Sequence, residues 1–337
     1  MVAASRRLAR RALPEVPLPL PPLAPPARLL TRAAGLARAL PGLALLVVLL
    51  AAYNIGQVLS LLALPVSRRA FLAYNRGGAR LWWRLFGLLV RALHGARVEV
   101  TGDRLPRGGN LLVVANHQQM ADICFLALLA DRQRAAGDLK WFVKRQVRYV
   151  PLLGWGMAFL DNLFVERSWS RDRRSIEATF ARLRRDGARF WVVLFAEGTR
   201  ATAEKIAAGG RLWQRQGREP ALHVLPPRTR GFVATLAGLA GALPAVCDLT
   251  IAYEGGVPSL WQFILGYAPV ARVHVRLFGF AELPVSDEDR AAWLFDRYAL
   301  KDRILDRHYA GVALDTAAAE LDPPPSVRES VASKASL

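Results

Sequence analysis

The stretch Leu111-Leu-Val-Val-Ala-Asn-His-Gln-Gln-Met-Ala-Asp122 is the most informative part of the sequence about the fold. Its five apolar residues, 111–115, predict a buried β-strand, and a polar turn then leads into an apolar helical stretch over 119–131. A strand that ends in a polar strand–helix turn is typical of the sheet edge at which α/β proteins bind ligands. We therefore expect His117 and Asp122 to lie at such an edge.

The sequence on both sides continues this alternation of strands and helices. Further β-like runs occupy 98–101, 141–144, 191–195, 246–252 and 272–278, and further helical stretches occupy 171–185, 202–216 and 288–308. The pattern predicts the α/β class, with a mostly parallel sheet flanked by helices, in a domain over 97–313. Residues 314–337 are rich in Ala, Pro and Ser and are expected to form a disordered tail.

The composition is both strongly apolar and strongly basic. Of the 337 residues, 53% are apolar, and 46 Lys and Arg against 27 Asp and Glu give a formal net charge of +19. A chain this apolar can bury a core, which excludes a purely disordered basic tail. The charge favours an anionic partner: nucleic acid, anionic lipid or a phosphorylated small molecule. Two cysteines, Cys124 and Cys247, are too few for a disulfide framework or a Cys-rich metal module.

The N-terminal part of the chain predicts attachment to a membrane. Residues 1–38 form a basic, Pro-rich leader, which we expect to be disordered on the membrane surface; an organellar transit peptide is the alternative. Residues 39–67 contain no charged residue and are predicted to be a transmembrane segment, with a buried core helix as the alternative. The polar residues Asn54, Gln57 and Ser60 leave open a break or a hairpin instead of one straight span.

The next segment, 68–96, predicts an amphipathic helix at the membrane interface. Basic and apolar side chains lie near different helical faces: Arg80, Arg84 and Arg91 against Trp83, Phe86 and Val90. A surface helix that packs on the domain is the alternative.

His117 and Asp122 carry the strongest chemical signal. Five residues of separation, partly spent in a turn, can bring the carboxylate back towards the imidazole. A carboxylate bonded to one ring nitrogen fixes the tautomer and leaves the other nitrogen as a base for a substrate hydroxyl. A structural histidine and half of a metal site are the alternatives. None of the other four histidines has ligand spacing to His117, so no metal is predicted.

Three further segments add anion-binding groups. After the run at 191–195 comes Glu197, and then Gly198 permits close backbone approach, Thr199 offers a hydroxyl and Arg200 a planar donor fork. A helix cap beside a surface arginine is the alternative there. The stretches 143–156 and 163–167, with Lys144 and Arg167, set basic residues among apolar ones, which suits a phosphate head with an apolar tail. Residues 225–232 form a Pro-stiffened turn with two more arginines.

These four segments, in this order, resemble the motifs of the glycerolipid acyltransferase superfamily. Asn116-His-x-x-x-x-Asp122 is similar to the first motif, Leu163-Phe-Val-Glu-Arg167 to the second, Phe195-Ala-Glu-Gly-Thr-Arg200 to the third and Leu225-Pro-Pro227 to the fourth. This resemblance covers roughly residues 70–310. Three stretches are closer still to the eukaryotic-type 1-acylglycerol-3-phosphate (lysophosphatidic acid) acyltransferases: Tyr149-Val-Pro-Leu-Leu-Gly-Trp155, Val165-Glu-Arg-Ser-Trp-Ser-Arg-Asp172 and Leu225-Pro-Pro-Arg-Thr-Arg-Gly-Phe232. The sequence departs from the family pattern at Ala196, at Asp161 and in the Gln-Gln-Met-Ala of 118–121.

The resemblance implies a membrane-bound enzyme that transfers an acyl chain from acyl-CoA to the sn-2 hydroxyl of lysophosphatidic acid, with His117 as general base oriented by Asp122. Glu197, Gly198, Arg200 and Arg167 would bind the glycerol phosphate, and Thr199 and Lys144 are further substrate-binding candidates. We expect no cofactor besides the co-substrate acyl-CoA. The expected partners are lysophosphatidic acid, acyl-CoA and the bilayer, without nucleic acid. The expected location is the endoplasmic reticulum membrane, with an organelle envelope as the alternative.

Three other functions remain open. A different lysophospholipid acceptor, of the lysophosphatidylinositol or lysocardiolipin type, would use the same catalytic pair. A non-enzymatic basic membrane protein that gathers anionic lipid would need neither His117 nor Asp122. A nucleic-acid binder is suggested by charge alone, but the aromatic residues near arginines lie in apolar stretches rather than on a recognition helix or a stacking platform.

Overall fold

The computed structural model describes residues 19–166 and 168–323. Residues 1–18 of the expected leader, Arg167, and residues 324–337 of the expected tail lie outside the described residues.

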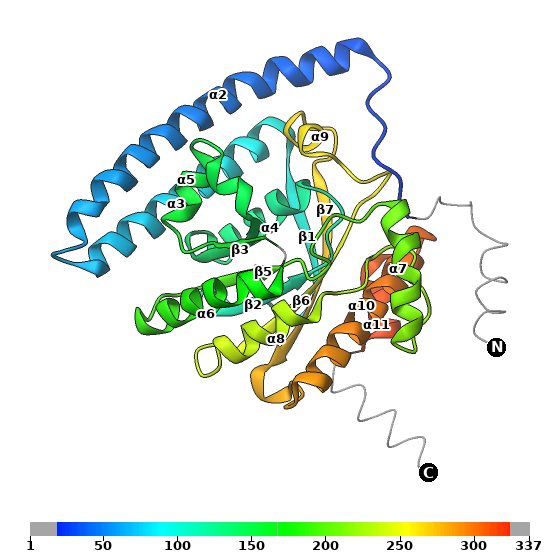
Figure 1. The fold of residues 1–337 in the computed structure, drawn as a ribbon. Helices are drawn as coiled ribbons and strands as arrows, with labels where there is room; N and C mark the ends of the chain where they lie inside the picture. The colour runs from blue at the N-terminus through cyan, green and yellow to red at the C-terminus, as the bar shows by residue number, and fades with distance from the viewer. Residues whose placement is uncertain (1–18, 167, 324–337) are drawn as a thin grey trace.

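Seven strands form one sheet, in the order β1-β7-β6-β2-β5-β3-β4. Their bounds are β1 Arg97–Gly102, β2 Leu111–Ala115, β3 Leu139–Lys144, β4 Leu163–Val165, β5 Trp191–Leu194, β6 Ala245–Ala252 and β7 Val270–Gly279. The pairings are parallel except for β6 with β7, which is antiparallel. The predicted α/β class with a mostly parallel sheet is therefore confirmed (Figure 1). Strand β4, only three residues long, was not predicted.

Helices cover both faces of this sheet, and β2 shows why its residues are all apolar. Leu112 and Val114 pack into a core with α6 (Trp169–Arg185), α8 (Thr229–Gly238) and α10 (Asp287–Tyr309). Leu111, Val113 and Ala115 pack into a second core with α3 (Arg68–His94) and α4 (Ala121–Arg132). Because both faces of a central parallel strand are buried, the strand reads as a continuous apolar run. The remaining described α-helices are α2, α5 (Leu153–Ala158), α7 (Ala203–Arg215), α9 (Leu260–Ile264) and α11.

The expected tail is partly ordered, so the prediction of disorder over 314–337 was wrong for its first residues. Helix α11 spans Leu314–Leu321, and Leu314, Ala317 and Ala318 are buried in the first core. The Asp322 carboxylate that follows accepts a 2.7 Å hydrogen bond from Arg297 of α10. An Ala-rich segment thus forms a helix because tertiary contacts bury one side of it.

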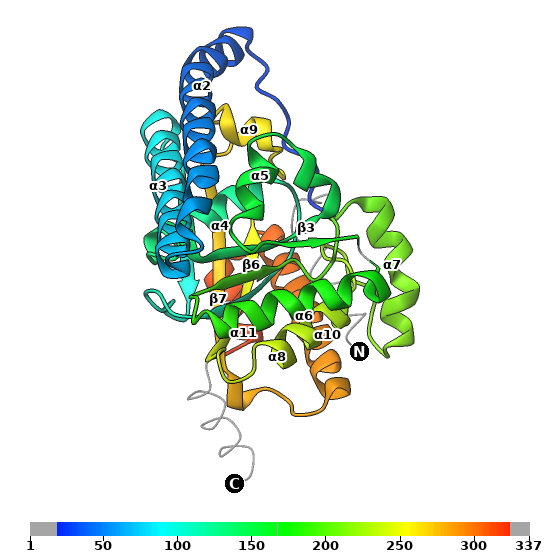
Figure 2. The same ribbon diagram turned by 60° about the vertical axis from the view of Figure 1, so that its left-hand side comes forward.

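Helix α2 spans Leu29–Ser60, so it begins ten residues before the predicted apolar segment. It starts after the last proline of the leader cluster, Pro26, and it continues through Pro41. The helix continues without a break through its polar residues Asn54, Gln57 and Ser60, whose side chains are buried. Gln57 Nε2 donates to Asn75 Oδ1 of α3 at 3.0 Å, and Asn75 Nδ2 donates to Ser60 Oγ at 3.0 Å. Helices α2 and α3 run side by side along one flank of the domain (Figures 1 and 2).

Candidate functional site

His117 lies directly after β2, at the carboxyl edge of the sheet. The side chain of Asn116 holds this turn against β6: its Nδ2 donates to the Ile251 carbonyl at 3.0 Å, and the Ile251 amide donates to its Oδ1 at 2.8 Å. The imidazole stacks on the ring of Phe195, with the two centroids 4.0 Å apart and an interplanar angle of 17°. The stacking on Phe195 and the hydrogen-bonded backbone at Asn116 together fix the orientation of the His117 ring.

Asp122, in the first turn of α4, receives four hydrogen bonds and is fully buried. Oδ2 lies 2.9 Å from His117 Nδ1 and accepts from the backbone amides of Gln118 at 2.7 Å and Gln119 at 3.0 Å. Oδ1 accepts from the Tyr253 hydroxyl at 2.5 Å. A carboxylate with this set of donors acts as an acceptor, so Nδ1 carries the proton and Nε2 has a free lone pair. Within the described part of the chain, no group hydrogen-bonds Nε2.

Glu197 is buried, and its two oxygens are used by the protein itself. Oε1 accepts from the His117 backbone amide at 2.9 Å, and Oε2 accepts from the Leu225 amide at 3.3 Å. Burial raises the pKa of this carboxyl well above its usual range. The side chain expected to bind substrate therefore joins the turns that follow β2 and β5 to the turn before α8.

A group of cations surrounds the neighbouring turn at 198–200. Arg200 donates to Gln119 Oε1 at 2.6 Å, and the Lys205 ammonium donates to Thr199 Oγ1 at 2.9 Å. Gly198 has φ of +68°, and a Cβ at this position would lie 2.8 Å from Cδ of Arg228. A glycine is needed here both for the backbone conformation and for the close approach of the arginine.

None of these three cations, Arg200, Lys205 and Arg228, forms a salt bridge with a carboxylate among residues 19–166 and 168–323. Their turns lie next to the His117–Asp122 pair, because the Ala201 amide donates to the His117 carbonyl at 2.8 Å and the Arg228 amide donates to the Ala196 carbonyl at 2.7 Å. The arrangement is a surface suited to an anion within reach of His117. We call these three residues the cationic cluster.

Lys144 lies at the same carboxyl edge of the sheet as His117, because β3 runs parallel to β5 and β5 runs parallel to β2. Lys144 ends β3 with an exposed side chain, and no hydrogen bond or ion pair described here joins it to the other predicted site residues. Arg167 lies outside the described residues. Within the described ranges, no group of three or more His, Cys, Asp or Glu could hold a metal ion.

Several residues near His117 were not predicted as site residues from the sequence. Tyr253 follows β6, and Tyr298 of α10 bridges two strand ends, with its hydroxyl donating to the Ala115 carbonyl at 2.8 Å and accepting from the Ala196 amide at 3.2 Å. Both tyrosines are more than 100 positions from their partners in the chain. No local spacing connects such residues, so no signal in the sequence could have found them.

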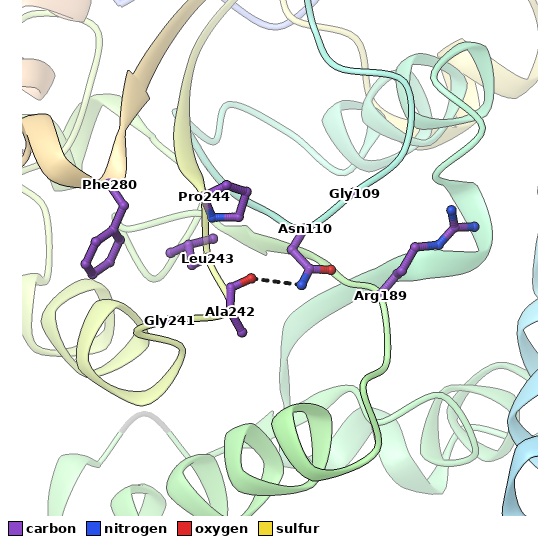
Figure 3. A pocket seen from close by; sticks show the side chains of 8 residues that line it. All are labelled: Gly109, Asn110, Arg189, Gly241, Ala242, Leu243, Pro244 and Phe280. Carbon is purple, nitrogen blue, oxygen red and sulfur yellow. Dashed lines mark hydrogen bonds between the residues drawn. The ribbon is translucent and has the colours of Figure 1, made fainter.

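A pocket lies at the opposite edge of the sheet (Figure 3). Asn110 precedes β2, Arg189 precedes β5 and Phe280 follows β7, so the pocket is separated from His117 by the length of β2. The Asn110 amide donates to the Ala242 carbonyl at 2.8 Å, and Arg189 pairs with Asp138 at 3.5 Å. Its polar groups are already engaged, and it contains none of the predicted site residues.

The fold and the site together define an α/β protein with a histidine–carboxylate pair beside a cationic cluster. The family model described as Acyltransferase matches residues 97–235, and that described as Acyltransferase C-terminus matches residues 262–329. The chain belongs to the acyltransferase family.

Known relatives agree with this assignment. The chain is 31% identical over 252 residues to 1-acyl-sn-glycerol-3-phosphate acyltransferase 2 of Brassica oleracea, covering 73% of this chain and 64% of the relative. The protein of the same name from Arabidopsis thaliana is also 31% identical, with 73% and 65% covered. The delta acyltransferase of that name from Bos taurus is 30% identical, with 74% and 67% covered. The chain thus spans slightly less than two thirds of the length of the two plant relatives.

One solved structure is weakly similar to this chain. It is the crystal structure of the 1-acyl-sn-glycerophosphate (LPA) acyltransferase, PlsC, from Thermotoga maritima, with 15% sequence identity and a TM-score of 0.47 over 80% of this chain and 97% of that chain.

Proposed function

We propose that this protein transfers an acyl chain from acyl-CoA to the sn-2 hydroxyl of lysophosphatidic acid, which yields phosphatidic acid and CoA. One observation carries the proposal: the turn that bears His117, whose Nδ1 is bonded to Asp122, is hydrogen-bonded to the turn that bears the cationic cluster. Lysophosphatidic acid carries both a hydroxyl, which the histidine can activate, and a phosphate, which the cationic cluster can bind. The acyltransferase relatives support the same choice of reaction.

In the proposed reaction His117 acts as general base. The hydroxyl proton of the acceptor moves to Nε2 as the acceptor oxygen forms a bond to the thioester carbonyl carbon. When the carbon–sulfur bond breaks, the departing thiolate takes this proton from the imidazolium. CoA leaves as the thiol, an ester remains on the acceptor, and the base is restored. Asp122 stabilises the imidazolium that exists between these two proton transfers.

The acceptor phosphate is assigned to the cationic cluster, with Thr199 and the backbone at Gly198 as neighbouring donors. Arg200 and Arg228 offer planar forks, which suit phosphate oxygens. Glu197 is assigned to positioning, since backbone amides occupy both of its oxygens. Arg167 and Lys144 stay candidates for further contacts with the phosphate or with CoA.

A cluster of three cations favours an acceptor with a phosphate monoester. Such a group carries close to two negative charges near neutral pH, whereas a phosphodiester carries one. Lysophosphatidic acid is therefore the first choice over acceptors of the lysophosphatidylinositol or lysocardiolipin type. An acceptor panel with the purified protein distinguishes them.

Helix α2 suggests that the protein associates with a membrane. Among the described residues it is the one helix that is long and apolar enough to cross a bilayer, judged by length and composition. Its outward side carries exposed apolar residues along most of its length: Leu29, Leu30, Leu36, Leu40, Leu45, Val47, Val48, Ile55, Val58 and Leu59. This surface would keep the enzyme where both lipid substrates dissolve, in the endoplasmic reticulum or an organelle envelope.

The test is an acyltransferase assay with lysophosphatidic acid and labelled acyl-CoA. Wild type should form labelled phosphatidic acid, and His117→Ala should lose this activity by at least about a hundredfold while keeping its expression and membrane association. An active His117→Ala would contradict the proposed mechanism. A wild-type protein that binds vesicles but acylates no acceptor in the panel would contradict the enzyme assignment and favour a non-enzymatic lipid-binding protein.

A further inference from the structure

Tyr253 makes a close contact with the catalytic pair from a distant part of the chain. It follows β6 directly, and its hydroxyl lies 2.5 Å from Asp122 Oδ1. The side chain is almost fully buried, and its ring packs against Phe125 of α4 with the centroids 5.8 Å apart. Asp122 Oδ2, the other oxygen of the same carboxylate, faces His117.

We propose that Tyr253 is a positioning residue for the reaction, which holds the Asp122 carboxylate in the rotation that places Oδ2 on His117 Nδ1. The proposal rests on the acyl transfer by His117 proposed above. Tyr253 touches neither substrate nor the reacting atoms, so it acts through Asp122.

The Tyr253 hydroxyl is placed to bind the Asp122 oxygen that faces away from His117. The backbone amides of Gln118 and Gln119 bind only Oδ2, so they leave Oδ1 free of backbone donors. The Tyr253 hydroxyl is the donor that fills this position. Without it, a buried carboxylate oxygen would lack a partner, and rotation about the Cβ–Cγ bond would no longer be resisted from that side.

The environment also keeps Tyr253 a donor. Burial raises the pKa of this phenol well above its ordinary value, and the negative charge of Asp122 raises it further. The hydroxyl therefore retains its proton over the whole working range of the enzyme. By taking up part of the Asp122 charge, it weakens the hold of the carboxylate on the imidazolium that must give its proton to the leaving thiolate.

The variant Tyr253→Phe tests this role, because it removes the hydroxyl and keeps the ring. Tyr309→Phe is the matched control: this second buried tyrosine donates at 3.2 Å to Gln118 Oε1 instead of Asp122. Initial rates would be measured over pH 5.5–9 with lysophosphatidic acid and acyl-CoA, and urea unfolding would report the stability of both variants. His117→Ala is run beside them.

For Tyr253→Phe we expect kcat to fall about tenfold, with the KM for the acceptor unchanged. The acid limb of the kcat/KM profile should move to higher pH, since a carboxylate with one donor fewer favours the imidazolium more strongly. Tyr309→Phe should keep both the rate and the profile of wild type.

Two results would overturn the proposal. A Tyr253→Phe enzyme with wild-type kcat and pH profile, beside an inactive His117→Ala, would remove Tyr253 from the mechanism and leave the proposed function intact. A Tyr253→Phe enzyme that loses activity only in proportion to its stability, with an unmoved pH profile, would show a purely structural role. If His117→Ala is active, it is the proposed function itself that fails.

Discussion

Two buried carboxylates flank His117, and their partners decide what each can do. Asp122 accepts hydrogen bonds from the His117 imidazole, two backbone amides and the Tyr253 phenol, so its carboxylate is placed to orient the histidine. Glu197 accepts hydrogen bonds from the backbone amides of His117 and Leu225, so it joins the loops that carry them. Residue type alone does not separate these roles, because the two side chains differ by one methylene group. The environment of each carboxylate does.

At the residue scale, Arg228 offers a test of the cationic cluster. We expect Arg228→Ala to raise the KM for lysophosphatidic acid about tenfold with little change in kcat, since a charge-assisted hydrogen bond to phosphate contributes about 1.5–3 kcal/mol. Steady-state kinetics with varied acceptor would measure it. Arg215→Ala, on the exposed end of α7, is the matched control and should behave as wild type. An unchanged KM for Arg228→Ala would remove this arginine from the binding site.

At the scale of elements, the close pairing of α2 and α3 depends on small residues. A Cβ on Gly78 of α3 would lie 2.0 Å from Cε2 of Tyr53 on α2. The Tyr53 ring cannot move away easily, because its hydroxyl donates to the Asn75 carbonyl at 2.5 Å. The adjacent Gly77 faces open space, with no atom within 4 Å of an added Cβ. Two neighbouring glycines of one helix thus have opposite environments.

This contrast predicts opposite effects on stability. Gly78→Ala should lower the free energy of unfolding by about 1–3 kcal/mol, because overpacking separates the helices. Gly77→Ala should raise it by up to about 1 kcal/mol through helix propensity. Urea unfolding of the detergent-solubilised protein compares the two. Equal stabilisation by both substitutions would mean that α2 does not pack on α3 as described.

At the scale of the whole molecule, α2 is attached to the domain along its length. Near its start, a Cβ on Gly35 would lie 3.1 Å from the Leu265 carbonyl oxygen. In its middle Trp82 Nε1 donates to the Leu46 carbonyl at 3.4 Å, and near its end Gln57 Nε2 donates to the Gly156 carbonyl at 3.2 Å. A helix that crosses the bilayer would draw the arginine-bearing α3 and part of the catalytic domain into the hydrocarbon. We therefore expect α2 to lie in the plane of one leaflet, in contrast to the transmembrane segment that the sequence pattern predicts.

Cysteine labelling distinguishes the two placements. The native Cys124 and Cys247 are buried, so Arg28→Cys, just before α2, and Arg69→Cys, in the first turn of α3 beyond the other end of α2, would each supply a single reactive thiol. With protein added to preformed sealed vesicles, we expect an impermeant maleimide to label both positions from outside. If one position reacted only after the vesicles were opened with detergent, α2 would span the bilayer and the in-plane placement would be wrong.

The sequence alone determined what depends on local pattern. Six of the seven strands and the helices α4, α6, α7 and α10 follow from apolar runs and helical periodicity, because burial selects those residue types within each element. The pairing of His117 with Asp122 was also predictable from local sequence, because only five residues and a turn separate them. The apolar helix was also predicted, although its true start at Leu29 and the order of α11 were not.

The tertiary structure alone decided which distant residues share the site. A parallel sheet brings the carboxyl ends of β2, β5 and β6 to one edge, and through them His117, Glu197 and Tyr253 meet, although long crossover segments separate these residues in the chain. The inward orientation of Gln57 on α2 also depends on tertiary packing, because its hydrogen-bond partner Asn75 lies on α3. Residue type sets which groups can bond, and the path of the backbone sets which of them come within reach.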